Sequence, residues 1–279
     1  MNKELTSTKS ILHSKGLVAI SKCLLLWILN LLFLFIIGQF IVKLFDPRWE
    51  RAIYGVPGTL AALLATLIVL KIENKSLKDI GLYWQRSTTL KFFKGIFIGV
   101  LCFGFLLSML LLFTPLQIQK NSASISFIDL LSYWPILPLA FMEEIAFRAY
   151  PMIRLTSVYG LRITQIIVAI AFALYHVATG WTLFAAFLGP GVWAIVFGLS
   201  AQWSGGIAMP TGIHVALNIL QPLVGMGAGN YTSIWFLDYP QGTIPVQIQR
   251  AENMGLILQL SILLFAWLAT EFYIRKNKK

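Results

Sequence analysis

Long uncharged stretches dominate the pattern of apolar and polar residues along this chain. Three mostly apolar runs of 18 to 20 residues contain no charged side chain: 23–42, 53–70 and 95–113. A fourth apolar stretch, 127–152, has Asp129 at its edge and is interrupted further in by two acids and one base, and the stretch 163–237 contains no charged residue. Because a hydrocarbon core about 30 Å thick needs about 20 apolar residues per helical pass, these runs predict transmembrane helices.

The 163–237 stretch is long enough for three passes, which glycine-rich breaks at Gly180, 204–206 and 225–229 place at 163–180, 182–203 and 207–226. A last apolar run at 254–270 completes the pattern. The chain is therefore predicted to be an all-α, polytopic membrane bundle of about eight transmembrane helices. Its single membrane domain, 23–274, is expected to lie between a polar N-terminal tail, 1–22, and a basic tail, 275–279.

Composition supports this class of protein, since 58% of the residues are hydrophobic and only 12% are charged. A soluble protein of this size would lack the charged residues that its surface needs. The net charge of +11 is explained better by basic loops on one side of the membrane than by nucleic-acid binding. On the predicted topology, 16 of the 22 Lys and Arg residues fall on one side: within 3–22, 71–94, 154–162 and 275–279. This bias predicts that both termini are cytoplasmic, and no nucleic-acid partner is expected.

Three charged residues within the fourth pass are the most informative exceptions. A charge at the centre of a bilayer costs at least about 2.5–3.5 kcal/mol on insertion scales. Glu144 and Arg148 are four residues apart, a helical spacing that favours an ion pair. Glu143 points in another direction, about 100° around the helix, with no partner in its own helix. An unpaired carboxylate at this depth is a candidate functional group, although a purely structural charge network is the alternative.

The remaining titratable groups of the membrane region lie on two other predicted passes. His176 follows Phe172 by four residues, and His214 precedes Asn218 by four, so each pair shares one helix face. A lone membrane histidine usually forms an interhelical hydrogen bond. Histidines on two passes, together with an acid on a third, instead favour a site built between helices.

This ordered set of motifs, Glu143-Glu144-x-x-x-Arg148, Phe172-x-x-x-His176 and His214-x-x-x-Asn218, resembles the CPBP (Abi) family of intramembrane proteases, which includes the CAAX endoproteases. The resemblance covers about 125–225. It implies that Glu143 activates a water molecule, that His176 assists, and that His214 and Asn218 stabilise the oxyanion. It also implies supporting roles for Glu144, Arg148 and Phe172.

Alternatives from other classes stay open. Glu143, His176 and His214 could ligate zinc in a metalloprotease, although the metal-free mechanism is favoured and no cofactor is expected. Gly198-x-Ser200 with His214 gives only a loose match to a rhomboid-type serine protease. A transporter or immunity protein could use the same residues as a proton or cation site, but two related halves, which many transporters have, are not visible.

The expected partners are the lipid bilayer and a membrane-associated peptide or protein substrate. The short tails look bacterial and no eukaryotic sorting signal is present, so we expect a multi-pass protein of a bacterial cell membrane. For the same reason a peptide or membrane-protein substrate is favoured over a prenylated one.

Overall fold

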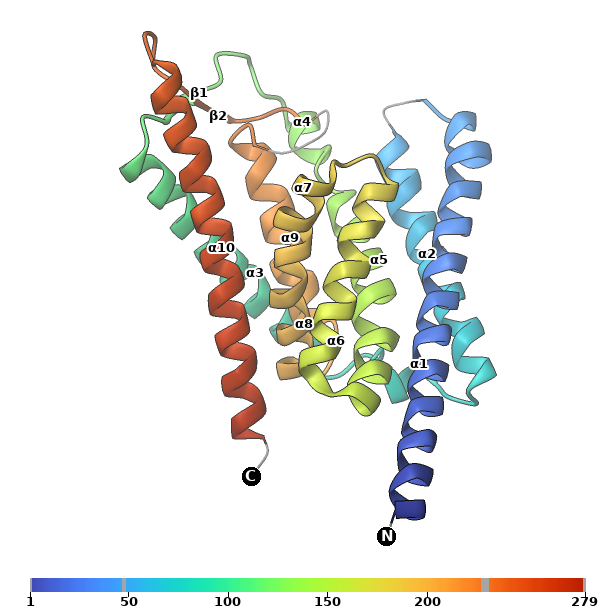
Figure 1. Cartoon of the computed structure of the whole chain (residues 1–279). Coiled ribbons are helices and arrows are strands. Elements are labelled where there is room, and N and C mark those ends of the chain that lie inside the picture. Colours follow the sequence, from blue (N-terminus) through green and yellow to red (C-terminus); the bar gives the residue numbers. More distant parts are fainter. Residues whose placement is uncertain (1, 47–48, 227–230, 278–279) are drawn as a thin grey trace.

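The computed structural model describes residues 2–46, 49–226 and 231–277, with side chains from residue 14 on, as a bundle of helices that run along one common direction (Figure 1). The long helices are α1 (Asn2–Ile36), α2 (Glu50–Ile72), α3 (Thr88–Phe113), α5 (Ile136–Glu144), α6 (Tyr150–Ala178), α8 (Val192–Ser204), α9 (Ala208–Leu223) and α10 (Pro245–Lys276). Short helices α4 (Phe127–Leu131) and α7 (Leu183–Ala186) precede α5 and α8, and strands β1 (Gln117–Lys120) and β2 (Trp235–Asp238) pair antiparallel. The predicted all-α bundle is confirmed.

Shorter helical turns complete the described chain. Three are π-helical turns, at Ile37–Ile41, Ile145–Ala149 and Phe187–Gly191, and two are 3-10 turns, at Val42–Leu44 and Leu77–Ile80. The predicted N-terminal tail is helical, since α1 already begins at Asn2.

Six helical stretches of the described chain are long and apolar enough to cross a membrane. Two features account for the difference from the eight predicted passes. The 52-residue stretch Phe127–Ala178 counts as one span but contains two of the predicted passes. Gly160, with φ 74° and ψ 168°, breaks α6 into two arms within this stretch. The pass predicted at 207–226 corresponds to α9, which has only 16 residues. The chain is a multi-pass membrane protein, while the count of eight and the orientation stay predictions.

Glycine residues end helices at two of the predicted breaks. Gly180 has φ 103° after α6, and Gly205 has φ 69° after α8. These left-handed conformations are accessible to glycine at little steric cost, and they stop the helix in each case. The third predicted break, 225–229, lies partly outside the described residues, but Gly225 has φ 73° just after α9.

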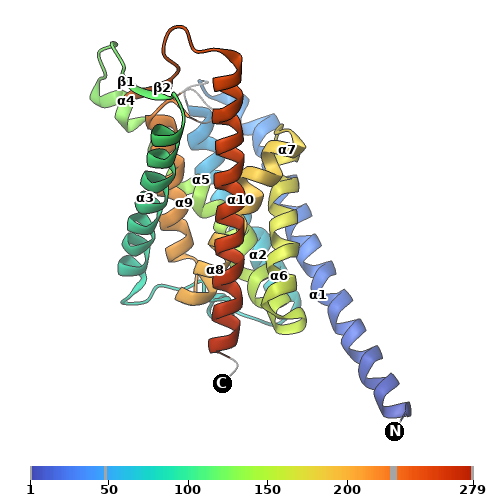
Figure 2. The ribbon, with the colours of Figure 1, turned by 60° about the vertical axis from the view of Figure 1, so that its left-hand side comes forward.

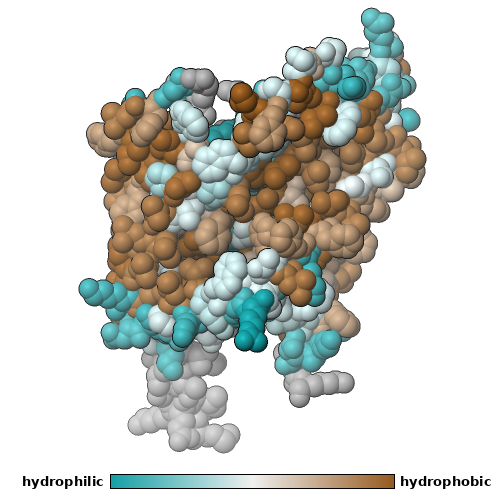
Figure 3. All heavy atoms as spheres, turned by 180° about the vertical axis from the view of Figure 1, so that it is seen from behind, coloured by the Kyte–Doolittle hydropathy of each residue, from teal (hydrophilic) through white to brown (hydrophobic). Residues whose placement is uncertain are grey.

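The distribution of polar residues on the surface fits a membrane-spanning bundle. On the face seen in Figure 3, hydrophilic residues gather towards the two ends and a broad hydrophobic band lies between them. Large apolar side chains of the membrane helices are exposed, for example Leu112 and Phe97 of α3 and Leu60 of α2. In a bilayer these side chains would contact lipid tails.

Helix α9 is held against α3 by direct backbone contact, and the two lie side by side in Figure 2. Gly95 and Gly99 of α3 face α9, and Gly212 of α9 faces the carbonyl oxygen of Phe92. A Cβ atom at any of these three positions would clash with the backbone of the partner helix. Small residues spaced by four let membrane helices approach in this way, so the glycines set the position of α9.

Helix α5 is positioned by α2 and α1. The Thr59 hydroxyl lies 2.8 Å from the carbonyl oxygen of Pro138, and Gly58 leaves room for the Met142 side chain. The indole nitrogen of Trp27 donates a hydrogen bond of 3.0 Å to the carbonyl of Ala146, in the π turn that follows α5. Two neighbouring helices therefore hold the segment that carries the paired acids.

A cluster of charges ties three helices together at the end of the bundle where most basic residues gather, which we call the basic end. The carboxylate of Glu73, just after α2, lies 2.8 Å from Nζ of Lys22 on α1 and 3.0 Å from Nε of Arg154 on α6. Lys75 lies 3.7 Å from its second oxygen. Burial alone would raise the pKa of Glu73, but the hydrogen bond from Lys22 and the charge of Arg154 outweigh burial and lower it.

Replacing Glu73 by glutamine is expected to destabilise the bundle by about 1 kcal/mol at neutral pH, because this ion cluster is partly exposed. A folded-state pKa below the unfolded value gives stabilisation that is present above the unfolded pKa and lost as pH falls through the folded pKa. The difference between native and variant should therefore shrink as the pH falls below the unfolded pKa of about 4.3, and vanish below the folded pKa of Glu73. Unfolding in detergent across a series of pH values from neutral to strongly acidic measures it, and a difference that does not shrink in acid would contradict the pairing.

Candidate active site

The two adjacent acids lie at the C-terminal end of α5, directly before the π turn Ile145–Ala149. Their environments differ sharply, since the Glu143 side chain is 14% exposed and that of Glu144 is fully buried. π-helical turns are rare and often occur at functional sites, because the wider turn redirects the side chains around it. Here the turn follows the acids and carries Arg148.

Arg148 is buried and pairs with Glu144 across the π turn. Its Nη1 atom lies 3.5 Å from Oε1 of Glu144. The guanidinium carbon lies 4.0 Å from the ring centroid of Phe172 and 5.2 Å from that of Phe197. Aromatic faces attract a desolvated cation, so these rings compensate in part for the water that Arg148 has lost.

His214 on α9 contacts both acids with its two ring nitrogens. Nδ1 lies 2.9 Å from Oε1 of Glu144, and Nε2 lies 3.6 Å from Oε2 of Glu143. The ring also stacks on Phe197, with the centroids 4.6 Å apart. Because a carboxylate accepts hydrogen bonds, Nδ1 carries the proton shared with Glu144, and Nε2 faces Glu143.

Glu143 has an unsatisfied oxygen in this arrangement. Its Oε2 atom is buried and forms no hydrogen bond with any residue that the structure describes. A buried polar atom without a partner is costly, and such atoms are uncommon in folded proteins. Oε2 of Glu143 can therefore accept a hydrogen bond from a molecule that binds beside it and beside Nε2 of His214.

His176 reaches the same cluster through an aromatic neighbour. It lies in the last turn of α6, where its Nδ1 donates to the carbonyl of Phe172 at 2.9 Å. The Phe172 ring lies 4.6 Å from the His176 ring and 6.3 Å from the His214 ring. The Phe172 ring thus neighbours both imidazoles, and among the described residues the Nε2 atom of His176 has no hydrogen-bond partner.

Asn218 is half-buried on α9, one turn beyond His214. Within the described part of the chain its amide forms no hydrogen bond, so it is not held in the cluster of acids and imidazoles. Of the predicted site residues, the structure joins Glu143, Glu144, Arg148, His214 and Phe172 by direct contacts and brings His176 next to Phe172.

The three residues of the alternative zinc site do not form a ligand set among the residues that the structure describes. A two-histidine, one-carboxylate site needs Glu143, His176 and His214 to converge on one point. No group of three or more His, Cys, Asp or Glu side chains in the described chain could hold a metal ion. His214 instead uses Nδ1 for Glu144.

Other candidate residues have different partners. The Ser200 hydroxyl, considered for a serine-type mechanism, donates to the carbonyl of Phe197 in its own helix at 2.8 Å. Two aromatic residues that the sequence did not single out contact the histidines: Phe197 stacks on His214, and Trp181 lies 5.4 Å from the His176 ring. Both stand in apolar surroundings with no local motif, so only the packing of separate helices reveals them.

Comparison with known proteins gives one match. Residues 125–220 match the model of a protease family described as type II CAAX prenyl endopeptidase, Rce1-like. No curated protein and no solved structure matches the chain. The matched segment begins just before α4, ends within α9 and contains the Glu143, Phe172–His176 and His214–Asn218 motifs.

The resemblance that the motifs predicted is therefore confirmed for this part of the chain. The match supports a membrane-embedded endopeptidase of the CAAX protease type, acting in the bilayer on a peptide substrate.

Proposed function

We propose that the protein is an intramembrane endopeptidase in which Glu143 is the general base that activates water. One observation carries this proposal: the buried Oε2 atom of Glu143 has no hydrogen-bond partner among the described residues and faces Nε2 of His214 across 3.6 Å. A water molecule beside these two atoms could donate to the carboxylate. Transfer of its proton to Glu143 would give the hydroxide that attacks the peptide carbonyl carbon.

Glu144 and Arg148 would prepare His214 for this reaction. Glu144 accepts the Nδ1 proton at 2.9 Å, which sets the orientation of the ring, and Nη1 of Arg148 lies 3.5 Å from the same carboxylate oxygen. When the ring carries a proton on Nε2, this N–H can donate to the oxyanion of the tetrahedral intermediate. Glu144 is thus a positioning residue rather than a catalytic one.

His176 and Asn218 would assist Glu143 and His214 in the reaction. His176 donates through Nδ1 to a backbone carbonyl, so its Nε2 can accept a proton from water or return one to the leaving amine. Asn218 has a free amide one turn from His214, and it can supply a second donor to the oxyanion once a substrate is bound.

The surroundings of the site favour a membrane-associated peptide as substrate. An apolar cavity of about 610 Å³ lies between α2, α3, α5 and α9. Phe141 of α5 and Thr211 of α9 line it, and each lies three residues before a site residue on the same helix, Glu144 and His214. Such a cavity suits apolar side chains next to the scissile bond.

Chelation tests the metal-free form of this mechanism. We expect the purified protein to cleave a quenched fluorescent CAAX-type peptide in detergent, and to keep its kcat after treatment with a strong zinc chelator and removal of the chelator. The reason is that Glu143 activates the water as a general base without the help of a metal ion. Loss of activity that zinc restores would contradict the glutamate mechanism and favour the metalloprotease.

A further inference from the structure

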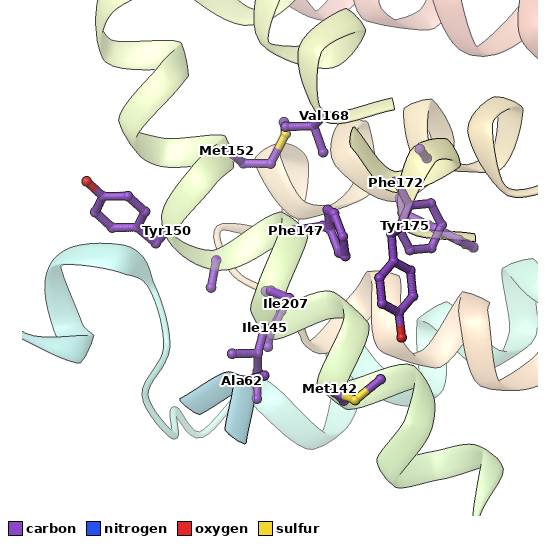
Figure 4. Packing of buried hydrophobic residues seen from close by; sticks show 14 of the residues in the cluster. Ala62, Met142, Ile145, Phe147, Tyr150, Met152, Val168, Phe172, Tyr175 and Ile207 are labelled. Carbon is purple, nitrogen blue, oxygen red and sulfur yellow. The ribbon is translucent and has the colours of Figure 1, made fainter. Parts of the chain in front are cut away.

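Two cavities lie at the basic end, beside the start of α9. The inner one, of about 340 Å³, reaches Ile145 and Ile207, which pack in the interior of the bundle (Figure 4). It shares Thr88 and Phe141 with the apolar cavity that we assign to the substrate. The outer one, of about 660 Å³, lies between α3, α8 and α9, and apart from Lys91 its lining differs from that of both other cavities. The proposed reaction therefore does not account for it.

We call the outer cavity the α3 groove. It is formed by α3 side chains between residues 90 and 98, with Trp203 and Ser204 of α8 and Met209 of α9. Its walls are mostly apolar and exposed, since Phe97 is 64% exposed and Trp203 is 73% exposed. Trp203 lies in the last turn of α8, and tryptophans at the ends of membrane helices commonly lie at the level of the lipid headgroups. The groove is therefore open to the lipids that surround the bundle.

Two lysines give the α3 groove a positive charge. Nζ of Lys91 lies 3.3 Å from the amide oxygen of Gln85, a neutral acceptor, and Lys94 is exposed. Neither lysine forms an ion pair with any residue that the structure describes, whereas Arg154 at the same end pairs with Glu73. The described lining contains no acidic residue, and neither does the first turn of α3. An anion bound here would meet two positive charges that no described carboxylate neutralises.

Charged and apolar side chains follow one another along the α3 groove. Helix α3 begins at the basic end with Thr88, so Lys91 and Lys94 come first and Phe97 and Ile98 lie further along the helix (Figure 2). With a rise of 1.5 Å per residue, Ile98 lies about 10 Å beyond Lys91. This order matches a phospholipid, whose anionic headgroup is followed by an acyl chain. A free phosphate ion would use only the charged end of the groove.

We propose that the α3 groove binds one anionic phospholipid from the leaflet at the basic end. Lys91 and Lys94 hold the phosphate, and an acyl chain lies along Phe97 and Ile98 next to Trp203. Basic pockets between transmembrane helices bind anionic lipid headgroups in this way. The binding does not depend on proteolysis, so it can be tested whether or not the protein cleaves peptides.

Binding of dioleoyl phosphatidylglycerol to the purified full chain in a non-ionic detergent, followed by native mass spectrometry, tests the site. We expect one bound lipid per chain, with an affinity at least about tenfold higher than for dioleoyl phosphatidylcholine, which has the same chains but no net charge, and weaker binding as salt rises. Lys94→Gln should lower the affinity about fivefold, and the double variant Lys91→Gln/Lys94→Gln about 30-fold. Thermal unfolding without lipid checks the fold of both variants. If the double variant does not fold, Lys94→Gln decides, because its side chain is exposed and lines only the α3 groove.

The matched control is Lys71→Gln/Lys78→Gln, which removes the same charge from exposed positions at the basic end that do not line the groove. It should change the affinity by less than about twofold, because these charges lie away from the bound headgroup. An equal loss in the two double variants would overturn the proposal, since general surface charge would then explain the binding. Equal affinity for the two lipids would overturn it as well. Displacement of the lipid by an equal concentration of inorganic phosphate would show an anion site rather than a lipid site.

Discussion

Replacing Glu143 by glutamine is expected to lower kcat by about 10²–10⁴-fold, the usual contribution of a general base. Glutamine keeps the size and shape of the side chain but cannot take a proton from water. Glu143 forms no ion pair with a lysine or arginine in the described chain, so the variant should stay folded and slightly gain stability from losing a charge within the membrane. Peptide cleavage by the purified protein, alongside its thermal unfolding in detergent, measures both effects.

The matched control for this experiment is Glu252→Gln, which removes an exposed carboxylate from α10. It should leave kcat unchanged. Equal cleavage by Glu143→Gln and the native protein would contradict the proposed role of Glu143. Comparing the membrane peptidomes of cells that carry the native protein or Glu143→Gln extends the test to natural substrates, since those substrates should accumulate only with the variant.

Replacing Arg148 by methionine is expected to destabilise the protein by about 3–5 kcal/mol, the cost of breaking a buried ion pair by removing one partner. Glu144 would then keep a fully buried carboxylate without its cation, and the rings of Phe172 and Phe197 would lose the charge that they surround. Unfolding in detergent measures the loss.

Two further variants distinguish a lost pair from a lost side chain. Adding Glu144→Gln to Arg148→Met should recover much of the stability, because no unpaired charge remains. The second variant, Arg162→Met, breaks the more exposed pair with Glu271, and it should cost only about 0–1 kcal/mol. If Arg148→Met and Arg162→Met lost similar amounts of stability, the result would contradict this expectation, because the buried charge of Arg148 would then add nothing to the stability of the fold.

Much of the architecture could be predicted from the sequence, because a bilayer restricts what a chain can do. Every spanning segment must be helical and apolar, so hydropathy alone located the runs that became α2, α3 and α10. The same scarcity of charge made Glu143, His176 and His214 stand out. Glycines marked the ends of α6 and α8, since their conformation is a local property.

The contacts of the site could not be predicted in the same way. The spacing of Glu144 and Arg148 predicted a pair on a regular helix, whereas the structure makes it across a π turn that Trp27 of α1 supports. His214 was expected to face a substrate oxygen, and the structure adds that its other nitrogen is bound to Glu144. Such contacts depend on how separate helices pack, and no local periodicity records that.

The close contact of α3 with α9 has a mechanical consequence. Four residues of α3 are buried, and through two of them, Gly95 and Gly99, it touches the backbone of the helix that carries His214 and Asn218. A change in bilayer thickness or lateral pressure that tilts α3 therefore moves α9 with it, relative to the acids on α5. The lipid composition of the membrane can in this way adjust the geometry of the site without binding to it.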